Sequence, residues 1–312
     1  ISASRVFLSK GGHIGKAVKP SSAATSEFDD TKLTRYCMKL ESLPVLSSIA
    51  EILPEPINIL EATLNHTESI LSPDQARQQD FRPHHYLQSL ISLDLSNNLI
   101  QDYSALSLFK TLQILKLDSN KLTALQPLTL PSLLDFSAAN NKIEKIVHFE
   151  GLAKRLKKVD LSGNLITKIE NLGQLRYLEL LDLSRNRISR VENLNQNLLL
   201  REIVLFGNSI VFVEPVVSLM LEKLLLSDNK LTSLDFNITA PNLTTLSLKG
   251  NLIETLAQSV QLLCPRLSEL NLSFNPLPEK ELIRIVSKLP SLKSLDYSVK
   301  SPQDSKILLP KL

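Results

Sequence analysis

The chain of 312 residues contains no tryptophan, and aromatic residues make up only 5% of it. Its core must therefore be mainly aliphatic. The formal net charge is only +3, which does not call for a nucleic-acid partner. No stretch approaches the ~20 apolar residues that a membrane-spanning helix needs. We therefore expect neither a nucleic acid nor a membrane as a partner.

Residues that carry out chemistry are also sparse. There are five histidines and two cysteines, and neither a His-Glu-x-x-His nor a Cys-x-x-Cys motif occurs. The glycines of Gly11–Lys16 resemble a phosphate-binding loop, but only three residues separate the outer two, and Ala17 replaces the required Ser or Thr. The sequence therefore predicts no catalytic, cofactor or metal site, and a protein that is not an enzyme.

A leucine pattern dominates the rest of the chain. The segment Leu156–Ile166 reads L-x-x-L-x-L-x-x-N-x-L, with valine at the second apolar position and isoleucine at the last. The pattern occurs nine times, with successive asparagines 21 to 24 residues apart. These residues are Asn98, Asn120, Asn141, Asn164, Asn186, Asn208, Asn229, Asn251 and Asn275. A period of this kind is the signature of a leucine-rich repeat, so we predict an α/β leucine-rich repeat solenoid.

Within one repeat, the run from Lys158 to Ser162 alternates between polar and apolar residues. This predicts a short strand with Val159 and Leu161 facing the core, stacked in parallel in a curved sheet on the concave side. The buried asparagine amide would satisfy backbone groups of its own and neighbouring turns.

The return segments on the convex side have a different period. After Asn164 the apolar residues are spaced by three, which predicts short 3₁₀ or irregular turns. The spacing after Asn251 shifts towards 3.6 from Ile253 to Leu267, which predicts a more helical return there.

Two repeats resemble a known family more closely. Ile169-Glu-Asn-Leu172 and Val191-Glu-Asn-Leu194 follow their repeat asparagines in the way typical of the 22-residue class of intracellular leucine-rich repeats. The namesake of this class is the leucine-rich regulatory subunit of protein phosphatase 1, and many ciliary and cytoskeletal proteins look similar. The resemblance covers about residues 88–297. It implies a phosphatase catalytic subunit or a cytoskeletal or axonemal protein as a partner.

The cysteines bear on the compartment. Secreted leucine-rich proteins resemble one another in carrying disulfide-paired caps, whereas Cys37 and Cys264 lie far apart in the sequence. We therefore expect a reducing, cytoplasmic location. Four glycosylation sequons, beginning at Asn65, Asn237, Asn242 and Asn271, are interpreted as incidental in so Asn-rich a chain.

The ends of the chain differ from the repeats. Residues 1–30 read as a flexible basic leader, with a transit peptide as the alternative. Residues 31–85 read as helical, including a helix from Pro56 to Leu71, and would form an N-terminal cap or a docking arm. The solenoid is predicted over residues 86–297. It ends in a capping helix within Pro276–Leu289 and a tenth strand at Leu292–Tyr297. Residues 298–312 read as a tail.

The predicted concave face contains one apolar patch, formed by Leu180, Val204, Phe206 and Leu225. Charged residues surround the patch and complete the predicted protein-binding site: Lys158, Asp182, Glu202 and Lys223. Such a patch is typical of a protein contact, although the chain's own ends could also cover it. The acids Asp94, Asp160 and Asp182 are interpreted as part of a solvated face, and Phe274 as a second possible anchor.

The sequence therefore predicts a non-enzymatic interaction scaffold or regulatory subunit that binds a protein on its concave face. Alternatives are an axonemal or cytoskeletal scaffold, or a subunit that recruits substrate to an enzyme complex. An extracellular receptor domain would require the sequons to be glycosylated. Nucleic-acid binding would require a basic stripe, whereas lysines on this face alternate with acids.

Overall fold

A computed structural model describes residues 61–63, 91–152, 155–234, 238–256 and 262–298. The chain divides into two compact units, one of residues 1–142 and 150–153 and one of residues 143–149 and 154–312. The predicted leader lies outside the described residues, as do most of residues 31–85 and all but the first residue of the predicted tail.

The first unit contains four short parallel strands that follow one another in chain order. They are β1 (Glu61–Thr63), β2 (Ser92–Asp94), β3 (Ile114–Lys116) and β4 (Asp135–Ser137). A 3₁₀ helix, η3 (Ser104–Leu108), lies in the return between β2 and β3.

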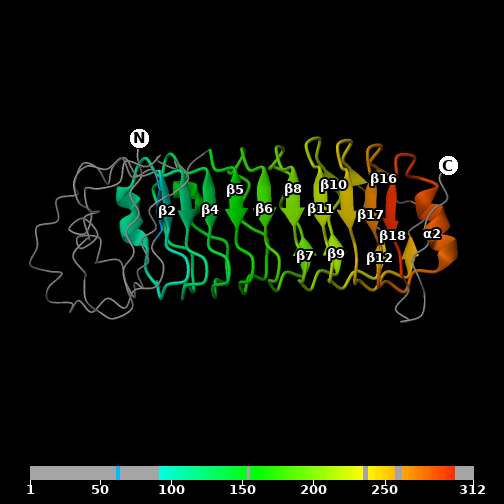
Figure 1. Cartoon of the computed structure of the whole chain (residues 1–312), viewed down its shortest axis with the longest axis horizontal. Helices are drawn as coiled ribbons and strands as arrows, with labels where there is room; N and C mark the ends of the chain where they lie inside the picture. Colours follow the sequence, from blue (N-terminus) through cyan, green and yellow to red (C-terminus); the bar gives the residue numbers. More distant parts are fainter. Residues whose placement is uncertain (1–60, 64–90, 153–154, 235–237, 257–261, 299–312) are drawn as a thin grey trace, which may run out of the picture. The chain divides into compact units, whose positions relative to one another are not determined.

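The second unit continues the same design with seven parallel strands in its main sheet (Figure 1). They are β5 (Lys158–Asp160), β6 (Leu180–Asp182), β8 (Glu202–Val204), β11 (Lys223–Leu225), β14 (Thr245–Ser247), β17 (Glu269–Asn271) and β18 (Ser294–Asp296). Each pairs with the next one in register, so residues at equivalent repeat positions lie side by side. A second 3₁₀ helix, η4 (Phe149–Gly151), precedes β5.

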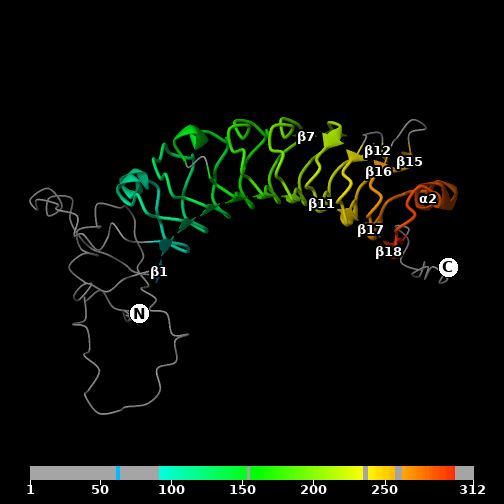
Figure 2. The same ribbon diagram turned by 90° about the horizontal axis from the view of Figure 1, so that it is seen from above.

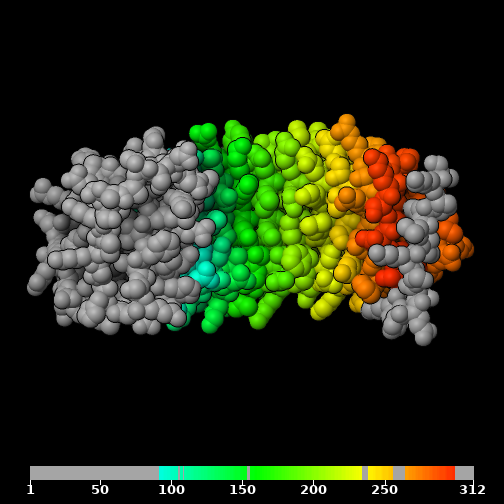
Figure 3. Space-filling view, in the orientation of Figure 1, coloured from blue at the N-terminus to red at the C-terminus, as the bar shows by residue number. Residues whose placement is uncertain are grey.

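Most described returns of the second unit contain strands of only two residues, on the side of the unit opposite the main sheet (Figure 2). They form pairs or triplets between successive returns. These strands are β7 (Arg190–Val191), β9 (Phe212–Val213), β10 (Val216–Val217), β12 (Ser233–Leu234), β13 (Ile238–Thr239), β15 (Thr255–Leu256) and β16 (Leu262–Leu263). The space-filling view shows successive turns in close contact (Figure 3).

Two helical predictions are wrong where the structure describes them. The return after Asn251 contains β15 and β16, which pair with β12 and β13 of the preceding return. The segment from Pro56 to Leu71, which was predicted to be a helix, contains the strand β1, whose Ala62 stands in register with Leu93. In both cases backbone pairing with a neighbouring turn overrides a local helical pattern, because strand stability depends on such non-local contacts.

The repeat asparagines are buried, and their side-chain amides connect successive turns. The Nδ2 group of Asn186 donates hydrogen bonds to the carbonyl oxygens of Leu183 (3.0 Å) and Ser184 (3.1 Å) in its own turn, and of Leu161 (2.9 Å) in the preceding turn. Its Oδ1 atom accepts a hydrogen bond from the Ile166 N–H at 3.0 Å. One side chain therefore satisfies four backbone groups that the turn leaves unpaired.

The residue before each of the nine asparagines adopts a left-handed backbone conformation. Three of these residues are glycines, and the others include Arg185 (φ +53°) and Phe274 (φ +60°). A bulky side chain at positive φ is uncommon and strained. The hydrogen bonds of the following asparagine hold this conformation at every repeat.

The C-terminal end of the solenoid carries the predicted helix and final strand. Helix α2 (Glu279–Val286) buries Leu282 and Ile285, and β18 follows it as the last strand of the sheet. The Tyr297 hydroxyl donates a hydrogen bond to the Leu277 carbonyl at 2.6 Å. This contact ties the end of β18 to the segment that leads into α2.

Replacing Asn186 with alanine is expected to lower the free energy of unfolding by about 3 kcal/mol, because the variant leaves buried backbone groups unpaired. Urea denaturation followed by circular dichroism would measure the change. The exposed Asn195→Ala variant is the control and should stay within about 0.5 kcal/mol of the parent. Equal stability of the two variants would contradict the role assigned to the asparagine amide.

The buried Cys264 thiol provides a second test of the core. Burial raises the pKa of this thiol to about 11. Since the thiolate is the reactive form, Cys264 is expected to react with a disulfide reagent about 100-fold more slowly in the folded than in the unfolded chain. A Cys37→Ser variant isolates the signal in a colorimetric thiol assay. Fast labelling of the folded variant would show that this part of the core is open.

Candidate functional site

All eight residues of the predicted binding site lie at or just after strands of the main sheet of the second unit. They lie on the face of the sheet opposite the core. Val204 stands in register with Leu225 and with Asp182, its neighbours on either side. Leu180 stands in register with Glu202, which in turn neighbours Lys223. Lys158 is beside Leu180, and Phe206 follows Val204 by two residues. The structure therefore brings the predicted residues together over four consecutive strands.

The four apolar residues differ in how much surface they offer. Leu180, Phe206 and Leu225 are partly exposed, whereas Val204 is only 7% exposed. We refer to Leu180, Val204, Phe206 and Leu225 as the sheet-face patch. Val204 therefore lies beneath the surface of the patch, and a partner would contact mainly the three larger side chains.

Phe206 is accompanied by a cation on one side of its ring. The Arg185 guanidinium lies 5.3 Å from the ring centroid. The same arrangement recurs further along the sheet, where Lys249 Nζ lies 5.4 Å from the ring centroid of Phe274. Such contacts hold an aromatic side chain in place. In each of these contacts, one of the two partners has a left-handed backbone conformation. It is Arg185 in the contact with Phe206, and Phe274 in the contact with Lys249.

The charges on this face are only partly neutralised. Lys223 Nζ lies 3.5 Å from a Glu202 carboxylate oxygen. Asp160 and Asp182 stand side by side in register, and among the described residues neither forms an ion pair. Burial raises the pKa of the Asp182 carboxyl, and the nearby Asp160 and Glu202 charges add to this effect. An acidic strip therefore borders the sheet-face patch on one side.

The aspartates also have a local structural role that sequence reasoning missed. Oδ1 of Asp182 accepts a hydrogen bond from the Ser184 N–H at 2.8 Å, and Oδ1 of Asp160 accepts one from Ser162 N–H at 2.9 Å. Each bond closes a short turn where the strand ends. The Asp-x-Ser spacing, present at both places, is the sequence signal for these turns.

The opposite side of the second unit contains a polar hollow of about 610 Å³. Its lining includes two carboxylates, Glu170 and Glu214, and the amides of Asn171 and Asn193. Asn171 and Asn193 each donate a side-chain hydrogen bond to the previous turn, at Ile146 and Ile169. The Glu-Asn-Leu motifs thus form a second asparagine ladder rather than a chemical site.

The described residues contain no group of three or more His, Cys, Asp or Glu residues that could hold a metal ion. Within the same part of the chain, no helix has the length and apolar character that crossing a membrane requires.

Replacing Asp182 with asparagine is expected to stabilise the protein by about 0.5 kcal/mol at pH 7, because the change removes like-charge repulsion in the sheet. A raised pKa means that the folded chain favours the neutral carboxyl. The stabilisation should therefore disappear as pH falls below the unfolded-state pKa of about 3.9. Denaturation at several pH values would measure this. Asp94→Asn is the control, since the register neighbour of Asp94 is Lys116, and it should not stabilise.

Comparison with known proteins gave matches among solved structures. Comparison with protein-family models gave none, and neither did comparison with the sequences of curated proteins. An internalin, inlF from Listeria monocytogenes, is 19% identical with a TM-score of 0.53, covering 82% of this chain and 64% of its own. The leucine-rich repeat domain of LRIM1 is 23% identical with a TM-score of 0.56, covering 79% of this chain and 77% of its own.

TLR13, crystallised as a complex with ssRNA13, is 21% identical with a TM-score of 0.60, covering 85% of this chain and 35% of its own. The chain thus spans less than two thirds of the internalin chain and about a third of the TLR13 chain. At such identities these likenesses concern the fold alone. Together with the repeat geometry, they show that the chain has the leucine-rich repeat fold.

Proposed function

We propose that the chain is a non-enzymatic scaffold that binds a partner protein on the sheet face of its second unit. The observation that supports this most is the sheet-face patch itself. Three partly exposed apolar side chains lie near Val204 and are bordered by Lys158, Asp182, Glu202 and Lys223. An apolar centre within a charged border is the usual composition of a protein contact.

The rigidity of the sheet also favours this function. The patch lies on strands that are held in register on both sides, so its side chains lose little conformational freedom on binding. The Arg185 contact restrains the Phe206 ring in the same way. A preformed surface of this kind fits a folded partner or a short apolar segment better than a small molecule.

The resemblance to the 22-residue repeat class suggests two classes of partner. One is a phosphatase catalytic subunit, and the other is a cytoskeletal or axonemal protein. Both fit a cytoplasmic location, which we propose because the chain's two cysteines lie far apart in the sequence, unlike those of disulfide-paired caps. A subunit that recruits substrate to an enzyme complex would use the same surface, so the identity of the partner distinguishes these possibilities.

The test uses the full chain as bait in quantitative affinity purification, beside a Phe206→Ser/Leu225→Ser double variant. These partly exposed positions are preferred to Val204, where a polar residue would be buried. Loss of both anchors is expected to weaken binding of the true partner by about tenfold or more. Calorimetric titration with the purified partner would then measure the dissociation constant.

A matched control is Val211→Ser, because Val211 is 58% exposed but lies beyond the end of β8, away from the sheet face. The control variant should retain the partner with unchanged affinity. If the double variant folds normally and binds every partner as the parent does, the sheet-face patch is not the binding site.

A further inference from the structure

A second apolar surface lies where the returns of the second unit enter the strands. In several returns, an i→i+3 backbone bond closes the last turn, as between Leu178 N–H and Leu175 O (3.1 Å) or Leu200 N–H and Asn197 O (3.2 Å). The first and last residues of this turn are buried. The two residues between them must therefore point outward, and polar residues are expected there.

Three consecutive turns break this expectation. Their outward residues include Tyr177, Leu198 and Leu219, which are 53%, 64% and 64% exposed. Met220 is also exposed, and Leu199 is partly exposed. We call Tyr177, Leu198, Leu199, Leu219 and Met220 the rim patch. Its members precede β6, β8 and β11, which are neighbours in the sheet.

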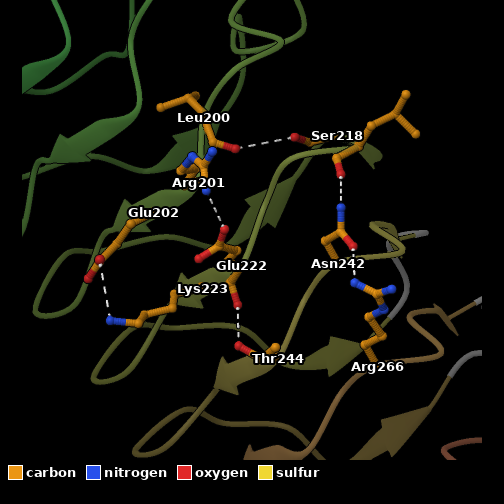
Figure 4. A network of polar contacts seen from close by, with 10 residues as sticks. Leu200, Arg201, Glu202, Ser218, Glu222, Lys223, Asn242, Thr244 and Arg266 are labelled. Carbon is orange, nitrogen blue, oxygen red and sulfur yellow. Dashed lines mark hydrogen bonds and ion pairs between the residues drawn. The ribbon is translucent and has the colours of Figure 1, made fainter.

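Hydrogen bonds connect successive turns along this edge, from Leu200 to Arg266 (Figure 4). Ser218 Oγ donates to the Leu200 carbonyl at 3.5 Å, and Asn242 Nδ2 donates to the Leu219 carbonyl at 2.8 Å. The Arg266 guanidinium donates to Asn242 Oδ1 at 2.8 Å. The apolar side chains therefore stand on an ordered edge rather than on separate loops.

Positive charge borders the rim patch at both ends. Arg155 and Arg176 lie at the equivalent turns on one side, and Arg266 lies on the other. Among the described residues, none of these three arginines forms an ion pair. The acids that directly precede β6 and β11 are already neutralised, since Glu179 pairs with Lys157 and Glu222 pairs with Arg201, both at 2.8 Å. The uncompensated charge along this edge is therefore positive.

We propose that the rim patch docks on an anionic membrane surface. The turns that carry the rim patch precede neighbouring strands and lie side by side along one edge of the sheet, so one surface can contact all of them at once. Leucine, methionine and tyrosine side chains can then enter the interfacial region while the arginines contact lipid phosphates. The uncompensated arginines at both ends provide the charge complementarity that identifies this occupant.

The sequence predicts no membrane partner, because no apolar run in it is long enough to span a bilayer. A surface contact needs no such run, since it uses side chains brought together from separate repeats. Docking at the edge would leave the sheet-face patch open, so the two surfaces are independent.

The experiment measures sedimentation of the full chain with phosphatidylcholine vesicles, with and without phosphatidylserine. The parent is expected to bind only vesicles that contain phosphatidylserine, less strongly at high salt. A Leu198→Glu/Leu219→Glu variant is expected to bind these vesicles at least about tenfold more weakly, because two apolar contacts become carboxylates facing an anionic surface. Circular dichroism and urea denaturation would confirm that it folds.

A Val211→Glu/Leu252→Glu variant is the matched control, because it places the same charges on exposed apolar positions after the strands. It should bind vesicles like the parent. An Arg155→Gln/Arg176→Gln/Arg266→Gln variant leaves the apolar residues unchanged and should lose the preference for phosphatidylserine, which keeps the test decisive if the glutamate variant unfolds.

Absence of vesicle binding by the parent would overturn the proposal, as would equal binding by the rim and control variants. A protein partner that the rim variant loses, without any vesicle binding, would also overturn it.

Discussion

The side-chain amide of the repeat asparagine is the interaction on which the structure of each unit depends. A strand of three residues followed by a sharp turn leaves carbonyl and N–H groups unpaired in a buried place. One asparagine amide satisfies groups of its own turn and of the turn before it, as Asn186 does for Leu183 and Leu161. The same bonds hold the preceding residue in a left-handed conformation. A nearly constant repeat length follows from this requirement.

Because the amide fixes each turn, the outward positions are free to vary. Residues in register form rows across the sheet and along its edges, so a surface can be assembled from single residues of successive repeats. The sheet-face patch and the rim patch both arise in this way. Neither is a continuous sequence motif, and each occupies repeats whose core positions are ordinary.

The sequence predicts the core features well because they depend on local spacing. The strands, the buried asparagines and the C-terminal helix with its following strand follow from period and residue type alone. The return after Asn251 and the segment containing β1 were wrongly expected to be helical, because pairing with a neighbouring turn decided their conformation. The sheet-face residues were correctly placed beside one another, but the burial of Val204 depends on packing that periodicity does not describe. The rim patch was missed because, in a sequence rich in leucine, an exposed leucine cannot be distinguished from a buried one.

The most direct test of the central proposal is photo-cross-linking from the sheet face. A photoreactive phenylalanine analogue at position 206 nearly preserves the native side chain, and the same analogue at position 211 reports on the surface after β8. A specific cross-link to one partner protein is expected from position 206 and none from position 211. Cross-linking to the same protein from position 211 alone would contradict binding on the sheet face.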